Sequence, residues 1–90
     1  MDIIKKASAG TMESSDAYVE ITPAQDGLNI ELESVVMAQF GAAIDATVRQ
    51  VLADHNVNNA NVRVVDRGAL ECVLRARVET AVLRGKGDAQ

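Results

Sequence analysis

The chain has 90 residues, 48% of them apolar but only 2% aromatic, and its 13 acidic and 9 basic side chains give a formal charge of −4. A domain of this length buries only about 60 to 65% of the surface that its unfolded chain exposes, so we expect one modest aliphatic core and little volume for a deep catalytic cleft. The negative charge repels phosphate and the scarcity of aromatic rings removes stacking platforms, which argues against nucleic acid as a partner.

The sequence also shows no sign of a targeting signal or of an internal disulfide. No apolar run approaches the roughly 18 to 20 residues of a membrane span, and the start, residues 1–6, does not resemble a signal peptide. The single cysteine, Cys72, cannot form an internal disulfide. We therefore expect a cytoplasmic protein that does not interact with membranes.

Two segments alternate between apolar and polar residues with the period of a half-buried strand. Their apolar positions are Ala17, Val19 and Ile21 in 17–22, and Leu28, Ile30 and Leu32 in 28–33. Pro23 ends the first segment, and the following Asp26-Gly27 can adopt the positive φ that a hairpin loop often needs. The pattern predicts that the two segments pair as an antiparallel β-hairpin over 17–33.

A long helix is predicted over about 35–54. Its apolar stripe has helical spacing and consists of Met37, Phe40, Ile44, Val48, Val51 and Leu52. Ser34 suits the N-cap, because its hydroxyl can accept a hydrogen bond from the first free amides. His55-Asn56 suits the other end, where Asn tolerates the left-handed conformation.

The last third of the chain predicts a strand over 61–66 and then an ambiguous segment. From Leu70 onward the apolar residues fit a strand over 70–77 as well as a helix over about 70–84. We favour the helix because its apolar stripe is longer, and the strand remains the alternative. Residues 85–90 are too polar to pack, so a flexible tail is expected there.

Together these elements predict an α+β domain of two layers. A small antiparallel sheet, made of the hairpin 17–33 and the strand 61–66, is packed by helices at about 35–54 and 70–84. A single domain covers 1–90, with 1–16 as an arm or loop. The other face of the sheet is then free for a partner or for this arm.

One segment has an unusual composition for a loop: positions 10–16 read Gly-Thr-Met-Glu-Ser-Ser-Asp. Ser14 has no His or Lys base in this segment, so it is not a self-activated nucleophile, and a transferase would have to modify it. Glu13 and Asp16 would repel a phosphate, so we expect them to keep the loop hydrated or to be recognised by the modifying enzyme. The segment is equally compatible with an ordinary solvated loop.

This segment resembles the prosthetic-group attachment sequence of the citrate lyase acyl carrier proteins, which usually reads Gly-Thr-Leu-Glu-Ser, a small residue and Asp. The resemblance covers nearly the whole chain and includes the stretches at 30–34, 39–41, 64–72 and 75–79. The departures keep size class or charge: Met12 stands for Leu, Arg67 for Lys and Glu71 for Asp. The fold expected here is not the four-helix bundle of ordinary acyl carrier proteins, whose Asp-Ser-Leu motif is also missing.

The resemblance implies a non-catalytic carrier subunit. Ser14 would carry 2′-(5″-phosphoribosyl)-3′-dephospho-CoA through a phosphodiester, and the terminal thiol of this group would hold acetyl or citryl. The implied partners are the citrate lyase alpha subunit (an acyl transferase), the beta subunit (a citryl lyase) and the transferase that attaches the prosthetic group. No metal site and no catalytic residue is implied.

Several alternatives remain open at this point. The protein could be the carrier subunit of malonate decarboxylase, or an unmodified adaptor that bridges subunits. Ser15 is an alternative attachment point. Cys72 has no neighbouring cation, so we expect an inert, buried or half-buried thiol. His55 is expected to be a helix-end residue, and Arg77, like Arg75, a member of a solvated, salt-bridged helix face.

Overall fold

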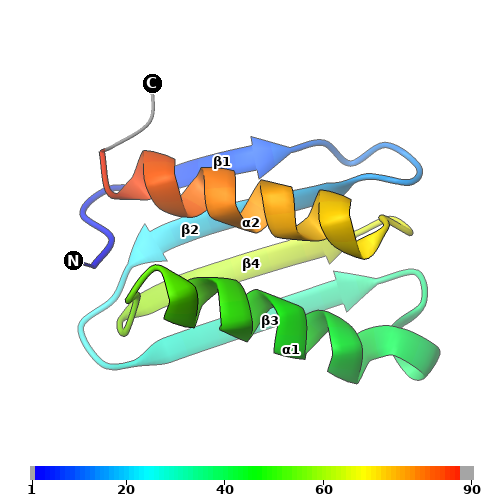
Figure 1. Ribbon diagram of the computed structural model, residues 1–90, viewed down its shortest axis with the longest axis horizontal. Helices are drawn as coiled ribbons and strands as arrows, with labels where there is room; N and C mark the ends of the chain where they lie inside the picture. The colour runs from blue at the N-terminus through cyan, green and yellow to red at the C-terminus, as the bar shows by residue number, and fades with distance from the viewer. Residues whose placement is uncertain (1, 88–90) are drawn as a thin grey trace.

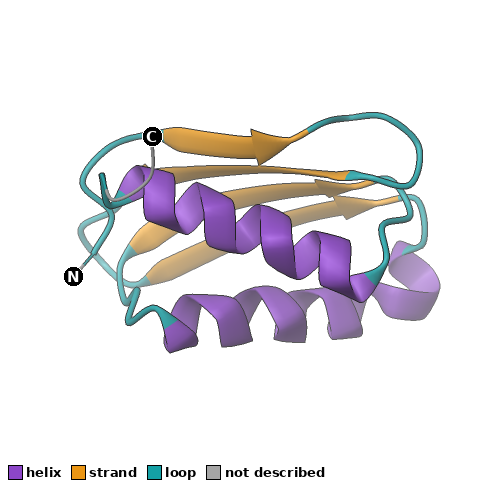
Figure 2. Cartoon of the chain, turned by 45° about the horizontal axis from the view of Figure 1, so that its top comes forward, coloured by secondary structure: helices purple, strands orange, loops and turns teal. Residues whose placement is uncertain are grey.

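The computed structural model describes residues 2–87 and contains a four-stranded sheet with both of its helices on one face (Figures 1 and 2). The elements follow in the order β1 (Ala7–Gly10), β2 (Ala17–Pro23), β3 (Leu28–Ser34), α1 (Met37–Asp54), β4 (Ala60–Asp66) and α2 (Glu71–Gly85). The predicted two-layer α+β class is therefore confirmed. Neither helix of the described part is long and apolar enough to cross a membrane.

The strands are ordered β1-β2-β4-β3, which differs from the predicted pairing. β4 is antiparallel to β2, with Val64 opposite Val19, and parallel to β3, with Val64 opposite Leu32. The predicted antiparallel hairpin of 17–22 with 28–33 is wrong, because β4 lies between these two strands (Figure 1). The sheet is consequently mixed and not antiparallel throughout.

The physical reason is the helix between β3 and β4. Two parallel neighbours need a crossover connection of a dozen or more residues, and α1 supplies it. Gly27 does adopt the positive φ that was predicted, at 75°. Its amide donates to Asn59 Oδ1 at 2.7 Å, and its carbonyl accepts from the Ala60 amide at 3.1 Å. The turn therefore carries the chain across the start of β4 instead of folding it back on β2.

The segment expected as an arm over 1–16 contains a strand that the sequence analysis missed. β1 pairs with β2 as an antiparallel hairpin, with Ala9 opposite Val19. Ile3 is buried, and the amides of Ile4 and Lys5 both donate to the Gly85 carbonyl. Only residues 11–16 remain as an exposed loop between paired strands. At the other end, Gly85 is buried within α2, and residues 88–90 of the expected tail lie outside the described residues.

The first helix begins two residues later than predicted, and Ser34 does not cap it. Ser34 ends β3, where its hydroxyl donates to Asp66 Oδ2 and accepts from the Val36 amide. An 18-residue helix is about 27 Å long, whereas the seven-residue strands span about 23 Å. The first turn of α1 therefore reaches past the sheet, and Met37 and Phe40 are exposed although they belong to the predicted apolar stripe.

The second helix confirms the preferred interpretation, and the strand alternative over 70–77 is wrong. The core lies between the two helices and the sheet. Its fully buried side chains include Val19 and Ile21 on β2, Val48 and Leu52 on α1, Val62 and Val64 on β4, and Val78 and Val82 on α2. At the C-terminal end of α1, Asn56 has a φ of 58°, the left-handed conformation that the sequence predicted.

Candidate functional site

Ser14 lies in the loop 11–16 that joins β1 to β2, at the end of the molecule where β4 ends and both helices begin (Figure 1). Its side chain is exposed, as predicted, whereas Ile44 in the core is buried. No residue between 2 and 87 hydrogen-bonds to the Ser14 hydroxyl. The hydroxyl is thus accessible to an enzyme, and nothing nearby activates it.

The backbone directly after Ser14 is anchored to Arg67. The Ser15 amide donates to the Arg67 carbonyl at 2.8 Å, and the Arg67 amide donates to the Asp16 carbonyl at 2.9 Å. Within the loop, the Thr11 hydroxyl accepts from the Glu13 amide. The loop is therefore an ordered platform for Ser14, connected to the segment that follows β4.

Asp16 has a structural role that the sequence analysis did not identify. Its carboxylate accepts two hydrogen bonds from Arg77 of α2, from Nε at 2.9 Å and from Nη2 at 3.1 Å, and it also accepts from the Thr11 hydroxyl at 2.7 Å and the Ala17 amide at 2.7 Å. The Arg77 guanidinium, followed by Thr11 and the Ala17 amide, holds the pKa of Asp16 well below its ordinary value. Asp16 therefore does more than keep the loop hydrated, because it ties the loop to α2. Arg77 is a partly exposed, salt-bridged residue of α2, as expected, and its partner is Asp16.

Gly10 allows the loop to close. Its φ is 89°, and a Cβ atom at this position would lie 1.8 Å from the Ala17 carbonyl oxygen. An L-residue therefore fits neither the backbone conformation nor the space. Ser15 also has a positive φ, at 67°, which turns the chain directly after Ser14.

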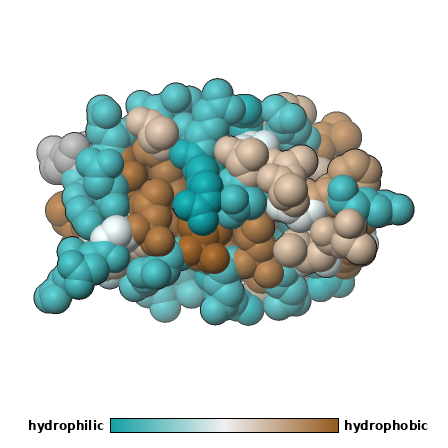
Figure 3. All heavy atoms as spheres, turned by 90° about the horizontal axis from the view of Figure 1, so that it is seen from below, coloured by the Kyte–Doolittle hydropathy of each residue, from teal (hydrophilic) through white to brown (hydrophobic). Residues whose placement is uncertain are grey.

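An apolar groove of about 360 Å³ lies between the starts of α1 and α2. It is lined mainly by apolar side chains, among them Phe40 and Ile44 from α1 and Leu70 and Leu74 from the α2 side. Figure 3 shows apolar side chains exposed along this side of the molecule, including the end at which α1 begins. This groove is a feature of the tertiary structure that sequence periodicity did not indicate.

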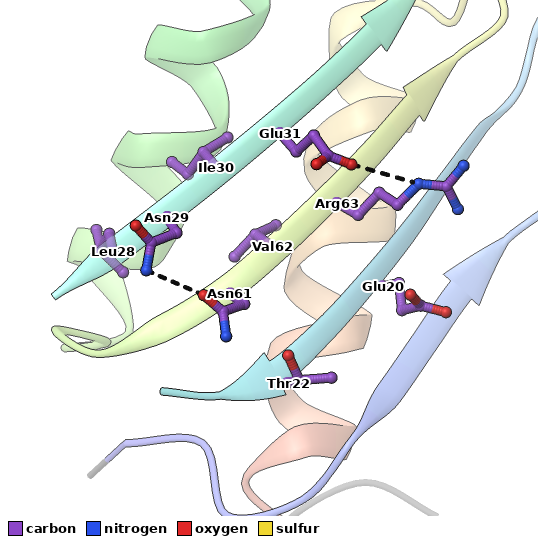
Figure 4. Close-up of a pocket in the computed structure, with 9 residues that line it drawn as sticks. All are labelled: Glu20, Thr22, Leu28, Asn29, Ile30, Glu31, Asn61, Val62 and Arg63. Carbon is purple, nitrogen blue, oxygen red and sulfur yellow. Dashed lines mark hydrogen bonds and ion pairs between the residues drawn. The ribbon is translucent and has the colours of Figure 1, made fainter. Parts of the chain in front are cut away.

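A second hollow, of about 550 Å³, lies on the sheet and is lined mostly by polar side chains (Figure 4). Across it, Arg63 Nε lies 3.8 Å from Glu31 Oε1, and Asn29 Nδ2 donates to Asn61 Oδ1 at 3.0 Å. No His or Cys lines this hollow, and it is not adjacent to Ser14 in the chain. Its chemistry is that of a hydrated polar face.

The remaining candidate residues do not form a reactive site. Cys72 is exposed, which contradicts the expected burial. It lies two residues from the buried Leu74 and thus on the opposite side of α2, because two residues turn a helix by about 200°. His55 Nε2 lies 3.0 Å from Glu79 Oε2, and Arg75 donates to Glu71 and Gln50. Within the described part of the chain, no three His, Cys, Asp or Glu side chains are placed to hold a metal ion.

Comparison with known proteins places this loop and fold in a family. A sequence profile described as Malonate decarboxylase delta subunit (MdcD) matches residues 4–85. The chain is 56% identical to citrate lyase acyl carrier protein 2 of Salmonella typhimurium, over 93% of this chain and 88% of that protein. It is 54% identical to the citrate lyase acyl carrier protein of Klebsiella pneumoniae, over 100% of this chain and 94% of the relative. The chain belongs to the citrate lyase acyl carrier protein family.

A solved structure has a similar fold. A chain in a crystal structure of a Pseudomonas malonate decarboxylase hetero-tetramer in complex with malonate superposes with a TM-score of 0.71. The two chains are 26% identical in sequence, and the match covers 86% of this protein and 79% of the Pseudomonas chain. The resemblance inferred from the sequence is thus confirmed. The citrate lyase acyl carrier proteins are more similar in sequence to this chain than the Pseudomonas chain is.

Proposed function

We propose that this protein is the acyl carrier subunit of a citrate lyase and that Ser14 is the attachment point of its prosthetic group. The observation that carries the proposal is an exposed serine, free of side-chain hydrogen bonds from residues 2–87, on a loop whose next two residues, Ser15 and Asp16, are hydrogen-bonded to Arg67. Membership in the citrate lyase acyl carrier family supports the same conclusion. The protein is a carrier and not a catalytic subunit.

The residues around Ser14 fit a bulky anionic group. The side chain is open to solvent, and Arg77 already neutralises Asp16, so this carboxylate adds little repulsion. Arg67, whose backbone holds the loop, has an exposed side chain that takes part in no ion pair within residues 2–87. We infer that Ser14 forms the phosphodiester and that Arg67 supplies a cation beside the phosphates.

When bound, 2′-(5″-phosphoribosyl)-3′-dephospho-CoA would supply a terminal thiol that holds acetyl or citryl as a thioester. The chain itself holds this arm on a small rigid body and presents it to the alpha subunit, an acyl transferase, and to the beta subunit, a citryl lyase. Tethering keeps the thioester at an effective concentration of about 1 mM around the active sites of the partner subunits. No base contacts Ser14, so attachment requires a separate transferase, and we place the complex in the cytoplasm.

The test is a set of single variants produced in a host that contains the transferase. Ser14→Ala should fold normally, take up no prosthetic group by intact mass, and leave the assembled lyase inactive. Ser15→Ala and Cys72→Ser are matched controls in the same or a nearby exposed environment, and both should keep the added mass and most activity. Peptide mapping that places the adduct on Ser15 or Cys72, or full activity of Ser14→Ala, would overturn the assignment.

A second candidate function is the carrier subunit of malonate decarboxylase, which the matching profile and the solved neighbour support. The acyl group found on the loaded protein separates the two: citryl or acetyl with citrate favours the citrate lyase, and malonyl favours the decarboxylase. A third candidate is an unmodified adaptor. A native protein whose intact mass equals that of the bare chain would identify it.

A further inference from the structure

The apolar groove between the starts of α1 and α2 is connected to the loop of Ser14 through Arg67. The Ser15 amide and the Asp16 carbonyl are hydrogen-bonded to Arg67, and the three residues after Arg67, Gly68 to Leu70, line the groove. A short path connects Ser14 to Leu70. It consists of the step from Ser14 to Ser15, the 2.8 Å hydrogen bond from the Ser15 amide to the Arg67 carbonyl, and the three residues after Arg67. At the maximum reach of a polypeptide this is at most about 20 Å, which is shorter than an extended nucleotide with a pantetheine chain.

The chemistry of the groove fits an apolar chain and not a free anion. Leu70 is 71% exposed and Phe40 is 53% exposed at its rim, an unusual exposure for large apolar side chains that are grouped on one surface. Asp66 lies at its base but is buried, and its carboxylate already accepts from the Ser34 hydroxyl and the Ala69 amide. The volume of about 360 Å³ lies within the range of small-molecule sites, about 300 to 1,000 Å³.

We propose that this groove holds the pantetheine end of the arm attached at Ser14 while no partner subunit is bound. The inference rests on the proposed function, because the arm reaches the groove only if Ser14 carries it. When the arm lies in the groove, apolar surface of Phe40 and Leu70 is removed from water, and the terminal thiol or its acetyl thioester is shielded from solvent. The tether makes even a weak site effective, because the local concentration of the arm is about 1 mM.

The first test uses the reactivity of the arm thiol. In a Cys72→Ser background the arm carries the only thiol, so its alkylation by iodoacetamide can be followed by intact mass. A site with a Kd of about 0.1 to 1 mM would slow alkylation roughly two- to tenfold relative to free pantetheine. Ala43→Phe places a ring in the groove and should restore the fast rate. Ala46→Phe is the matched control, since Ala46 is exposed on the same helix and does not line the groove.

The second test does not depend on any variant. Amide and methyl NMR signals of Phe40, Ala43, Ala69 and Leu70 should shift between the bare and the loaded protein, while those of Asn61 and Arg63 on the opposite sheet face should not. Unchanged groove signals in a protein with the arm on Ser14, or signals that change only when a partner subunit is added, would overturn the inference and leave the proposed function standing. A protein with no arm on Ser14 would instead contradict the proposed function.

Discussion

Gly10 shows at the level of one residue why the loop that holds Ser14 needs glycine. Gly10 and Gly68 share a φ of 89°, but a Cβ at Gly68 would meet nothing within 4 Å, whereas at Gly10 it would lie 1.8 Å from the Ala17 carbonyl oxygen. Gly68→Ala should therefore lower the free energy of unfolding only by the cost of holding an alanine in the left-handed conformation, about 1 to 2 kcal/mol. Gly10→Ala should cost clearly more, because the β1–β2 turn must also open.

The free energy of unfolding of both variants, from urea denaturation, measures this difference. Prosthetic-group uptake should fall in Gly10→Ala and not in Gly68→Ala, since only the former displaces the Ser14 loop. Equal stability losses would show that the close approach to Ala17 does not matter.

Asp16 predicts a pH dependence. Because its pKa is lowered in the folded state, chiefly by Arg77, the unfolded chain binds a proton more readily at this site. The resulting stability is present above about pH 4 and is lost as the pH falls toward the lower folded-state pKa. Asp16→Asn should thus be less stable than the wild type at pH 7, and the gap should narrow below about pH 4.

Urea denaturation between pH 7 and pH 3 tests this. The pKa of Asp2 is also lowered, mainly by its hydrogen bond to the Asn59 side chain. The Asp16→Asn variant should therefore keep part of the pH dependence of the wild type. Asp26→Asn is the control, because Asp26 is exposed and forms no hydrogen bond or ion pair within residues 2–87. A gap between Asp16→Asn and wild type that stays constant with pH would contradict the proposed role of Arg77.

At the scale of elements, α1 packs with its middle and C-terminal turns and projects with its first turn. Val48 is fully buried at 0% exposure, whereas Val35, just before the helix, is 66% exposed. Val48→Ala should destabilise the protein by about 1.5 to 3 kcal/mol, from lost burial and the cavity left behind. Val35→Ala should change stability by less than about 0.5 kcal/mol.

Chemical or thermal denaturation of the two Val→Ala variants gives the comparison directly. The same two methyl groups are deleted in both variants, and the higher helix propensity of Ala at position 48 would only reduce the difference. Similar losses in both variants would mean that Val35, just before α1, is packed although its side chain is exposed here.

The strand pairing illustrates what element-scale sequence reasoning misses. Alternation located β2 and β3 within a residue or two, but it specifies only which face of a strand is buried and not its neighbour. The order strand, long helix, strand over 28–66 indicates a parallel crossover, and this signal was available in the sequence. We gave more weight to the Asp26-Gly27 turn, which is compatible with both topologies.

At the scale of the whole molecule, the N-terminal residues tie β1 and α2 together. Ile3 is 5% exposed and contacts the core, while its neighbour Ile4 is 63% exposed. Ile3→Ala should cost about 2 to 4 kcal/mol in unfolding free energy, and Ile4→Ala less than about 1 kcal/mol. Urea denaturation of both variants, with hydrogen exchange of the β1 amides, measures whether loss of Ile3 also loosens the edge strand. Equal effects would contradict the packing described here.

The sequence by itself determined the features that depend on local pattern. Alternation and helical spacing identified β2, β3, β4, α1 and α2, because these periods arise from the geometry of each element. The family to which the chain belongs was recognised from contiguous motifs, and one of them contains Ser14, the proposed attachment point. No contact between distant segments was needed for these conclusions.

Only the tertiary structure decided what depends on contacts between distant residues. Asp16 and Arg77 are 61 positions apart, and β4 enters between β2 and β3 from later in the chain. The short strand β1 has a weak pattern of its own and is stabilised by pairing with β2 and by contact with α2. The groove is formed where residues 36–47 and 66–74, which are distant in the sequence, meet. These properties follow from packing, for which single-sequence periodicity contains no direct signal.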